Sequence, residues 1–348
     1  MKQNINKNNF RNLWNVEEDK ILKLWYGKIS VIEIDKKKLI PRHTIHSIRC
    51  RAKKLGFKSN LRQIKDTFDK QFFNNPNLIS CYWAGFLAAD GALIKKRNKT
   101  YTLQLALAEK DFEHLKKFKK SIKYTGEIRS FKNQCKIRPD KPSPLKNYYY
   151  IRINQMHNCV DGLKTFGIIP RKTYCFPPPS INDPLLQLSY IIGYFDGDGS
   201  VSANYNSGSL CLEILSSCEQ IIYWIQSFFD KYFNINSRKS KGCKPTRSKQ
   251  DNAYQYKITG YRAAKIIEIL RSFPVPKLDR KWNNPRIIEI LEKRKLKQKD
   301  FWAKRLPIEN LIFQLNSLWN PQSYSSEFFN PQPQNNSEIF PHNFDFSI

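Results

Sequence analysis

Residues 82–91 read Tyr-Trp-Ala-Gly-Phe-Leu-Ala-Ala-Asp-Gly, and residues 191–199 read Ile-Ile-Gly-Tyr-Phe-Asp-Gly-Asp-Gly. Each stretch is apolar, carries a glycine in its interior and ends in a carboxylate that is followed by glycine. A helix that is apolar on nearly all sides must be buried, and a glycine lets two helix backbones approach closely. We therefore expect two buried helices that pack against each other and place Asp90 and Asp198 side by side.

The glycines Gly85 and Gly193 mark the point where we expect the two helices to cross. Before each helix stands a polar residue and a proline, Asn75-Pro76 and Asp183-Pro184, which predict an N-cap and a first helical residue. The distance from proline to aspartate is the same in both copies. This match indicates an internal duplication.

The segments after each helix repeat in the same order: a strand pair, a helix, a second strand pair and a closing helix. We therefore predict an α+β fold of two pseudo-symmetric αββαββα repeats, residues 76–180 and 181–305, each with a four-stranded antiparallel sheet. The apolar face of each sheet would cover its helices, and the polar faces would form a saddle. The expected strands include 92–96, 101–108, 148–153, 200–204, 209–215 and 253–258, and the expected helices are 110–122, 157–166, 218–233 and 261–273.

Residues 12–58 predict a smaller module of three helices. Carboxylates at residues 17–19 suit the start of the first helix, and Gly56 ends a basic third helix. This arrangement describes a helix-turn-helix DNA-binding module within residues 1–60 and resembles Myb/SANT-like domains. The alternative is a small bundle with a solvated basic face. The apolar residues of the third helix that are expected to face inward are Ile45, Ile48, Ala52 and Leu55.

The chain is strongly basic. Sixty Lys and Arg against 30 Asp and Glu give a net charge of +30, which together with the motifs favours a nucleic-acid partner. The eight cysteines form no Cys-x-x-Cys pair, which argues against a zinc module, and no apolar run predicts a membrane span or a secretory signal. We therefore expect reduced thiols, no membrane association and an intracellular location, in a bacterial or phage cytoplasm or an organelle.

Two segments are expected to lie outside the folded domains. Residues 61–75 are polar and charged, and we predict that they link the small module to the first repeat. No Lys or Arg follows Arg305, and the end of the chain is rich in Asn, Pro, Gln and Ser. This composition predicts a mostly disordered tail over residues 306–348.

Two carboxylates at the C-terminal ends of two helices would form a strongly anionic spot, because such ends already carry partial negative charge. The spot would repel DNA unless divalent cations filled it, and Mg²⁺ prefers carboxylate, carbonyl and water oxygens. We predict Asp90 and Asp198 as metal ligands, with the carbonyls of Ala89 and Gly197 as further ligands. Two or more Mg²⁺ ions, for which Mn²⁺ could substitute, would activate a water for phosphodiester hydrolysis.

At these residues the two stretches resemble the LAGLIDADG signature of homing endonucleases. The second copy is close to the family consensus, whereas the first has Trp83 in place of the leading Leu and Ala88 in place of the first acid. In the family that first acid is usually not the metal ligand, and the final acid is kept in both copies. The resemblance implies a single-chain, monomeric, Mg²⁺-dependent enzyme that makes a staggered double-strand cut in a long, near-asymmetric DNA target.

Family members also place a basic residue near each active site. The segments after the two closing helices offer Lys172 and Lys281, which we predict as catalytic residues that orient the water or stabilise developing charge. Simple phosphate contact by these lysines is the alternative. Asn154 and Thr259, at the ends of strands, are weaker candidates.

Candidate DNA contacts lie on the basic third helix and on the sheets, whose side chains could read base edges in the major groove. An ordinary solvated face is the alternative for each of them. In the small module the candidates are Arg42, Thr44, His46, Ser47, Arg49 and Lys53, and in the repeats they are Lys95, Arg97, Gln104, Arg129, Arg152, Ser202, Asn204, Arg238 and Lys257.

Three functions remain open on the sequence. The first is a site-specific DNA endonuclease. The second is an RNA maturase that helps its host intron to fold, or a bifunctional maturase and endonuclease, because the resemblance extends to splicing cofactors. The third is a non-cutting DNA-binding regulator, which the loss of either Asp90 or Asp198 would have favoured.

Overall fold

The computed structural model of the protein divides into two compact units, Met1–Asp66 and Thr67–Ile348. Within the described helices, none combines the length and apolar character that crossing a bilayer requires. The described residues are 13–58, 66–96, 100–133, 144–154, 156, 159–172, 176–203, 208–235, 246–247 and 253–318.

The N-terminal unit contains the three expected helices, α1 (Val16–Trp25), α2 (Val31–Lys36) and α3 (Ile45–Lys54). Its small core consists of Leu22, Ile34, Ile40, Ile48 and Ala52. The prediction that Leu55 faces inward is wrong. Leu55 is 37% exposed, because α3 ends at Lys54 and the chain turns away at Gly56, whose φ is +73°.

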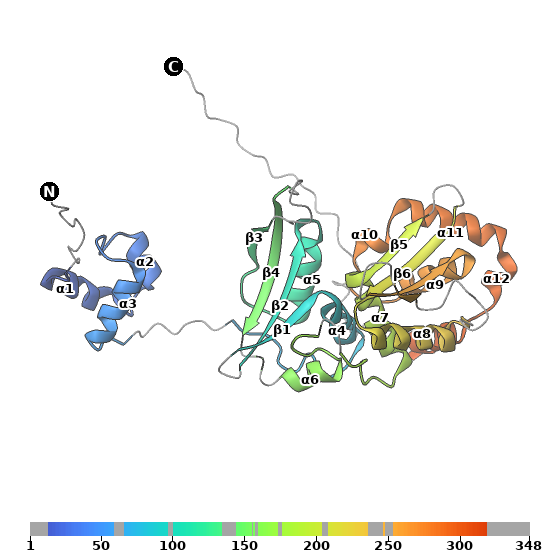
Figure 1. Cartoon of the computed structure of the whole chain (residues 1–348), viewed down its shortest axis with the longest axis horizontal. Helices are drawn as coiled ribbons and strands as arrows, with labels where there is room; N and C mark the ends of the chain where they lie inside the picture. The colour runs from blue at the N-terminus through green and yellow to red at the C-terminus, as the bar shows by residue number, and fades with distance from the viewer. Residues whose placement is uncertain are drawn as a thin grey trace, which may run out of the picture. The chain divides into compact units, whose positions relative to one another are not determined.

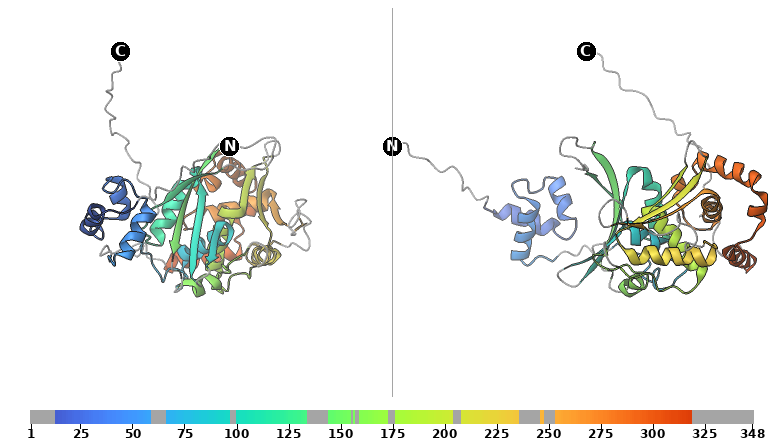
Figure 2. Two further views of the ribbon diagram at one scale, coloured as in Figure 1. Left: turned by 60° about the vertical axis from the view of Figure 1, so that its left-hand side comes forward. Right: turned by 45° about the vertical axis from the view of Figure 1, so that its right-hand side comes forward.

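The larger unit contains both predicted repeats, and the α+β fold with two four-stranded antiparallel sheets is confirmed. The strand orders are β1-β2-β4-β3 and β5-β6-β8-β7, which are the same arrangement twice. Figures 1 and 2 show the sheets on opposite sides of the α4–α7 pair. The first repeat contains α4 (Leu78–Asp90), β1 (Gly91–Lys95), β2 (Tyr101–Ala108), η1 (Glu109–Asp111), α5 (Phe112–Ser121), β3 (Arg129–Asn133), β4 (Lys146–Asn154) and α6 (Val160–Thr165).

The second repeat follows the same element order and then continues into further helices. The chain after α9 packs against β5 and α9 through α10 and α11. The elements of this part are α7 (Pro184–Asp198), β5 (Gly199–Ala203), β6 (Leu210–Ser216), α8 (Glu219–Tyr232), β7 (Thr246–Arg247), β8 (Tyr254–Thr259), α9 (Gly260–Ser272), α10 (Asp279–Trp282), α11 (Pro285–Lys297), α12 (Lys299–Ala303) and α13 (Pro307–Leu318).

Helices α4 and α7 cross at the two predicted glycines. A Cβ added to Gly85 would lie 1.9 Å from the carbonyl oxygen of Tyr190, and one added to Gly193 would lie 1.9 Å from the carbonyl oxygen of Tyr82. These distances are far below van der Waals contact, so each glycine faces the backbone of the other helix. The two contacts are related by a pseudo-twofold operation that exchanges Tyr82 with Tyr190.

Each sheet buries one face and leaves the other open. In β2 the buried residues Leu103, Leu105 and Leu107 alternate with partly exposed ones, as expected for a half-buried strand. Helix α5 covers the apolar face of the first sheet, and α8 and α9 cover that of the second. The opposite faces carry the polar side chains described below.

The predicted start of the first core helix is wrong. Helix α4 begins at Leu78, and its N-cap is Asn77 rather than Asn75. The Asn77 side chain accepts the N–H groups of Ile79 and Ser80, and the Ser80 hydroxyl accepts the N–H of Asn77. This capping box fixes the helix start after Pro76. The second prediction is confirmed, since Asp183 caps α7 and Pro184 is its first residue.

Two segments that were expected to lie outside the repeats pack against them. In the expected linker, Thr67 and Asp69 pair with the chain around residues 122–125, and the Phe73 side chain is 3% exposed in the main core. In the expected disordered tail, residues 307–318 form α13, with Ile308 fully buried. Apolar residues at helical spacing outweigh the lack of charge there. Residues 319–348 lie outside the described part of the chain.

Candidate functional site

The two motif aspartates stand at the C-terminal ends of the crossed helices. Asp90 is the last residue of α4 and Asp198 the last residue of α7, and a glycine caps each helix. A Cβ added to Gly197 would lie 3.4 Å from Asp90 Oδ2, so the Asp90 carboxylate lies against the end of α7. The helix crossing therefore brings the two carboxylates to one place.

Burial makes this place unfavourable for negative charge. It raises the pKa of Asp90 to about 6, and the neighbouring Asp198 carboxylate adds to the increase. Burial also raises the pKa of Asp198, while the positive charge of Lys172 and a hydrogen bond with Tyr194 oppose it. Nearby cations therefore favour the state in which both carboxylates are ionised together.

Lys281 lies on the backbone at the end of α7. Its Nζ donates to the carbonyls of Phe195 (2.8 Å), Asp196 (2.5 Å), Gly197 (3.2 Å) and Gly199 (2.7 Å). The ammonium thus neutralises the partial negative charge of the helix end. Burial lowers its pKa, and the negative charges of the surrounding aspartates oppose this shift.

Lys172 makes the corresponding contact at the end of α4. Its Nζ donates to the carbonyls of Ala88 (2.5 Å) and Ala89 (3.1 Å). Burial lowers its pKa, and the charges of Asp198 and Asp90 oppose the shift. The structure therefore gathers all four predicted catalytic residues at the ends of the two helices, and their roles stay predictions.

A hard divalent cation suits this group of donors. Two neighbouring carboxylates that raise each other's energy provide the anionic oxygens that Mg²⁺ takes. The predicted carbonyl ligands Ala89 and Gly197 already accept lysine hydrogen bonds, although each carbonyl oxygen retains a second lone pair. Among the described residues, no group of three or more His, Cys, Asp and Glu side chains could hold a metal. Asp90 and Asp198 would therefore be its only carboxylate ligands from the described part of the chain.

Sequence reasoning missed a buried polar network beneath the site. Asp196 is 1% exposed and accepts hydrogen bonds from the Tyr82 hydroxyl (2.6 Å), the Leu278 N–H (2.8 Å) and Trp282 Nε1 (2.6 Å). The Tyr82 hydroxyl also lies 2.9 Å from Nε2 of His114. The sequence does contain a signal for this network: Asp196 in the second motif occupies the position of Ala88 in the first.

The weaker candidates Asn154 and Thr259 are engaged elsewhere. Asn154 Oδ1 accepts Lys96 Nζ (3.0 Å) and Thr102 Oγ1 (3.1 Å) at the end of β4. Thr259 is the N-cap residue of α9 and pairs with Cys211 across the second sheet. Neither is joined to the aspartates by a contact in the described residues.

The open faces of the two sheets carry polar pairs at the same register position. In the first sheet Gln104 lies opposite Arg152, and Gln104 Oε1 accepts Arg152 Nε at 2.9 Å. In the second sheet Glu213 lies opposite Lys257, with 3.6 Å between carboxylate and ammonium. Gln104 and Glu213 hold equivalent positions, because each pairs with the second residue of the neighbouring edge strand, β1 or β5.

The remaining sheet candidates fall into three groups. Arg129 pairs with Tyr150 and shares the open face with Arg152, and Ser202 lies exposed on β5 opposite Cys211. Lys95 is exposed at the end of β1, but alternation from buried Leu93 puts it on the other face. Arg97, Asn204 and Arg238 lie outside the described residues.

In the N-terminal unit, four of the candidate side chains have structural partners: Ser47 Oγ lies 3.3 Å from His43 Nδ1, His46 Nε2 lies 3.5 Å from Cys50 Sγ, and Arg42 and Thr44 have the partners that follow. Arg42 donates to the Glu18 carboxylate at 3.0 and 3.1 Å, and this bond holds the pKa of Glu18 at about 2. The Thr44 hydroxyl caps α3 by accepting the N–H of Ser47. His46, Arg49 and Lys53 are exposed on α3, and Ser47 is partly exposed. The three helices are confirmed, whereas the helix-turn-helix function stays a prediction.

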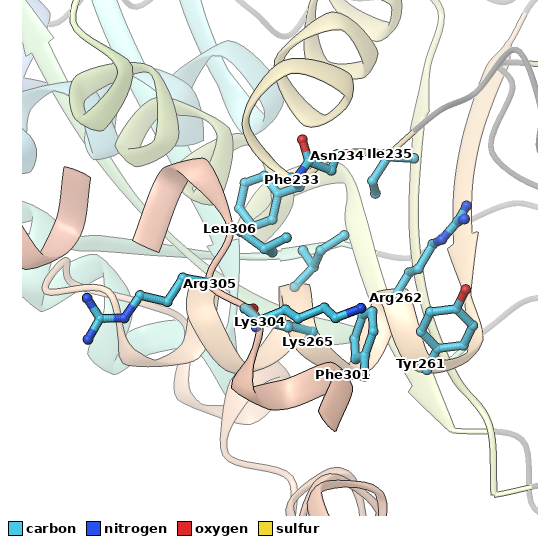
Figure 3. Close-up of a pocket in the computed structure, with 11 residues that line it drawn as sticks. Phe233, Asn234, Ile235, Tyr261, Arg262, Lys265, Phe301, Lys304, Arg305 and Leu306 are labelled. Atoms are coloured by element: carbon cyan, nitrogen blue, oxygen red, sulfur yellow. The ribbon is translucent and has the colours of Figure 1, made fainter. Parts of the chain in front are cut away.

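Described residues of the larger unit line a cavity beside the candidate site and another near the C-terminal helices. One, of about 740 Å³, is lined by β1 and by Ile169–Lys172 beside the candidate site. The other, of about 560 Å³, lies between α9 and α12, where Figure 3 shows Lys265 beside Phe301. The Lys265 ammonium is buried and bonded to Glu309 (3.1 Å) and to the Trp302 carbonyl (3.2 Å), so it ties the C-terminal helices to α9.

Comparison with known proteins links the second repeat to a family. Residues 186–270, from α7 into α9, match the family model of the LAGLIDADG-like domain. A comparison with curated protein sequences finds no match.

Several solved structures resemble the chain. One is the I-SmaMI LAGLIDADG homing endonuclease bound to cleaved DNA, with 12% identity, a TM-score of 0.39 and coverage of 71% of this chain and 98% of that one. Another is the LAGLIDADG meganuclease I-CpaMI bound to uncleaved DNA, with 15% identity, a TM-score of 0.41 and coverage of 71% and 99%. A third is the LAGLIDADG homing endonuclease I-GzeII in complex with its DNA target, with 14% identity, a TM-score of 0.38 and the same coverage as I-CpaMI.

Proposed function

We propose that the protein is a site-specific DNA endonuclease of the homing type, which makes a staggered double-strand cut by Mg²⁺-dependent phosphodiester hydrolysis. The observation that carries this proposal is the meeting of Asp90, Asp198, Lys172 and Lys281 at the ends of two crossed helices between two antiparallel sheets. The net charge of +30 supports a polyanionic substrate.

The chain's own residues supply positioning and charge. Asp90 and Asp198 would hold the metal, which when bound supplies an activated water and stabilises the leaving oxygen. Lys172 and Lys281, already held beside the carboxylates by backbone carbonyls, would stabilise charge that develops on the scissile phosphates. Arg129 and the Gln104–Arg152 and Glu213–Lys257 pairs would contact a long duplex on the open sheet faces.

The test begins with a cleavage selection on a randomised duplex library in Mg²⁺. The selected duplex is then given to Asp90→Asn and Asp198→Asn, which should bind it but make no double-strand cut, because each loses one of the two anionic ligands. Asp161→Asn, which changes an exposed aspartate on α6, is the matched control and should cut normally. Full cleavage by both motif variants would falsify the proposed chemistry.

The same selection tests the N-terminal unit. Deletion of residues 1–60 removes the three-helix module with its exposed basic residues on α3. If the module reads bases, the selected site becomes shorter. An unchanged site with weaker binding would mean that the module contributes to affinity and does not read bases.

A further inference from the structure

The two lysines of the candidate site are carried by different kinds of backbone. Lys172 follows Arg171, whose φ of +62° lies in the left-handed region, in an irregular segment after α6. Lys281 belongs to the short helix α10, which lies against β5. Within the described part of the chain, Lys172 touches two carbonyls of its core helix, whereas Lys281 touches four carbonyls at the end of α7.

A buried carboxylate fastens the α10 segment to the core. Asp196 Oδ1 accepts Trp282 Nε1 at 2.6 Å, and Asp196 Oδ2 accepts the Leu278 N–H at 2.8 Å. These two donors lie on either side of Lys281 in the sequence. The third donor is the hydroxyl of Tyr82 in α4, at 2.6 Å from Oδ2. Three donors satisfy a charge that would otherwise be costly to bury.

Among the described residues of the first repeat, α4 offers no carboxylate that could play the part of Asp196. Counting back from the motif aspartates, Ala88 in α4 occupies the position of Asp196 in α7, and its methyl group accepts no hydrogen bond. Tyr190 occupies the position of Tyr82, and its hydroxyl donates instead to the carbonyl of Phe166 at 3.0 Å. The asymmetry therefore lies in what holds each lysine, and the helix crossing itself is symmetric.

We propose that Asp196 is a positioning residue, which fixes the α10 segment so that Lys281 serves one of the two strand cuts. This inference rests on the proposed endonuclease function. Asp196 touches no reacting atom and acts through Leu278 and Trp282. Because a displacement of about 1 Å at a reacting group can cost roughly 100-fold in rate, loosening α10 should slow the cut that depends on Lys281.

The test measures each strand separately on the selected duplex, with a different fluorophore at each 5′ end, under single-turnover conditions in Mg²⁺. Lys281→Met and Lys172→Met first define which strand depends more on each lysine. Both carboxylate oxygens of Asp196 accept hydrogen bonds, so in Asp196→Asn the amide N–H₂ group takes the place of an acceptor and faces at least one of the three donors. This variant should slow the Lys281-dependent strand by about 10- to 100-fold, up to the loss expected when a reacting group is displaced by about 1 Å. The other strand should change by less than about threefold, as should the dissociation constant for the duplex.

A second variant decides the matter should Asp196→Asn fail to fold. Tyr82→Phe deletes one hydroxyl, keeps the carboxylate and should slow the same strand by a smaller factor. Tyr190→Phe is the matched control, because it deletes the pseudo-equivalent hydroxyl without touching Asp196, and it should leave the ratio of the two strand rates unchanged.

The outcomes separate this inference from the proposed function. If the wild-type protein cuts no duplex in the library, the endonuclease function itself fails. If the wild-type protein cuts but Lys281→Met, Asp196→Asn or Tyr82→Phe slows both strands equally, the positioning role is overturned. A slowing of the Lys172-dependent strand by Asp196→Asn, or wild-type rates in that variant, overturns it as well.

Discussion

Gln104 and Arg152 in the first sheet occupy the same register position as Glu213 and Lys257 in the second. In the first pair an amide oxygen accepts from the guanidinium, so the positive charge of Arg152 remains available. In the second pair a carboxylate lies 3.6 Å from the ammonium and offsets it. Two faces with the same backbone thus present different charge to whatever they bind.

The same division between shared backbone and different side chains appears beneath the sheets. Burial along α5 and α8 follows one pattern, which places His114 of the first repeat where the second has Ile221. Trp83 in α4 donates to Ser121 (2.8 Å), whereas the corresponding position in α7 is the apolar Ile191. The duplicated fold therefore depends on backbone packing, whereas each copy has its own polar contacts.

The largest expected effect tests the helix crossing, in which the two repeats have equivalent backbone contacts. Gly85→Ala and Gly193→Ala each place a methyl group against a backbone carbonyl that cannot move aside without separating the helices. Each should destabilise the protein by roughly 3 kcal/mol or more, at the upper end of overpacking effects. Urea unfolding measures the loss. Gly208→Ala, whose added Cβ has nothing within 4 Å, should cost only about 1 kcal/mol through its positive φ. Unequal losses at Gly85 and Gly193 would break the pseudo-twofold equivalence.

The next largest effect concerns the buried imidazole of His114, which corresponds to Ile221 in the second repeat. Burial lowers the pKa of His114 to about 3 from an ordinary 6.5. Between these values the unfolded chain binds a proton that the folded chain does not, so stability is lost as the pH falls through 6.5 towards 3. The loss can reach about 5 kcal/mol, at 1.36 kcal/mol for each unit of pKa shift.

The measurement compares urea unfolding of the wild-type protein and His114→Gln at pH 7, 6, 5 and 4. The variant keeps a polar partner for Tyr82 but does not titrate, so its stability should decline less steeply with acid. His46→Gln, which changes an exposed imidazole on α3, is the control and should follow the wild-type curve. Parallel curves for His114→Gln and the wild-type protein would contradict the prediction.

A smaller effect is expected on the open sheet faces. Arg152→Ala should weaken binding of the selected duplex by about tenfold, within the range of 1–3 kcal/mol for a good base contact. Lys257→Ala should weaken it by only about twofold, because Glu213 already offsets that charge. Fluorescence anisotropy at several salt concentrations measures both losses. Equal losses would show that the carboxylate does not distinguish the two faces.

The core of the fold could be predicted from sequence because its signals are local. The apolar run, the interior glycine and the terminal Asp-Gly of each copy identify α4 and α7, and alternation identifies the central strands. The helix start at Asn77 could not be separated from Asn75, because both are good N-caps and only the Ser80 side chain decides between them. Composition alone does not reveal helix α13, whose signal is the helical spacing of the apolar residues Ile308, Leu311 and Ile312.

The polar network around Asp196 could not be predicted from the sequence, for a different reason. Asp196 is joined to residues far away in the chain, Tyr82 and Trp282, and no local spacing reveals such a partnership. The lysines were predicted from their place after each closing helix, and the structure brings both to the ends of the core helices. That Lys281 has four carbonyl acceptors and Lys172 two depends on the paths of α10 and of the segment at Arg171, which only the folded backbone fixes.

The smallest effect is expected when the partner of the basic residue is exchanged between the two sheet faces, Glu213 in one and Gln104 in the other. Glu213→Gln gives the second sheet the neutral partner of the first, and should tighten binding of the selected duplex by a few-fold, because an attraction of roughly 1 kcal/mol on Lys257 is removed. Gln104→Glu makes the opposite change and should weaken binding by a similar factor. Anisotropy titrations at low salt, where exposed charges are least screened, give the greatest sensitivity. Shifts of the same sign in both variants would mean that the two pairs do not play corresponding roles, despite their shared register.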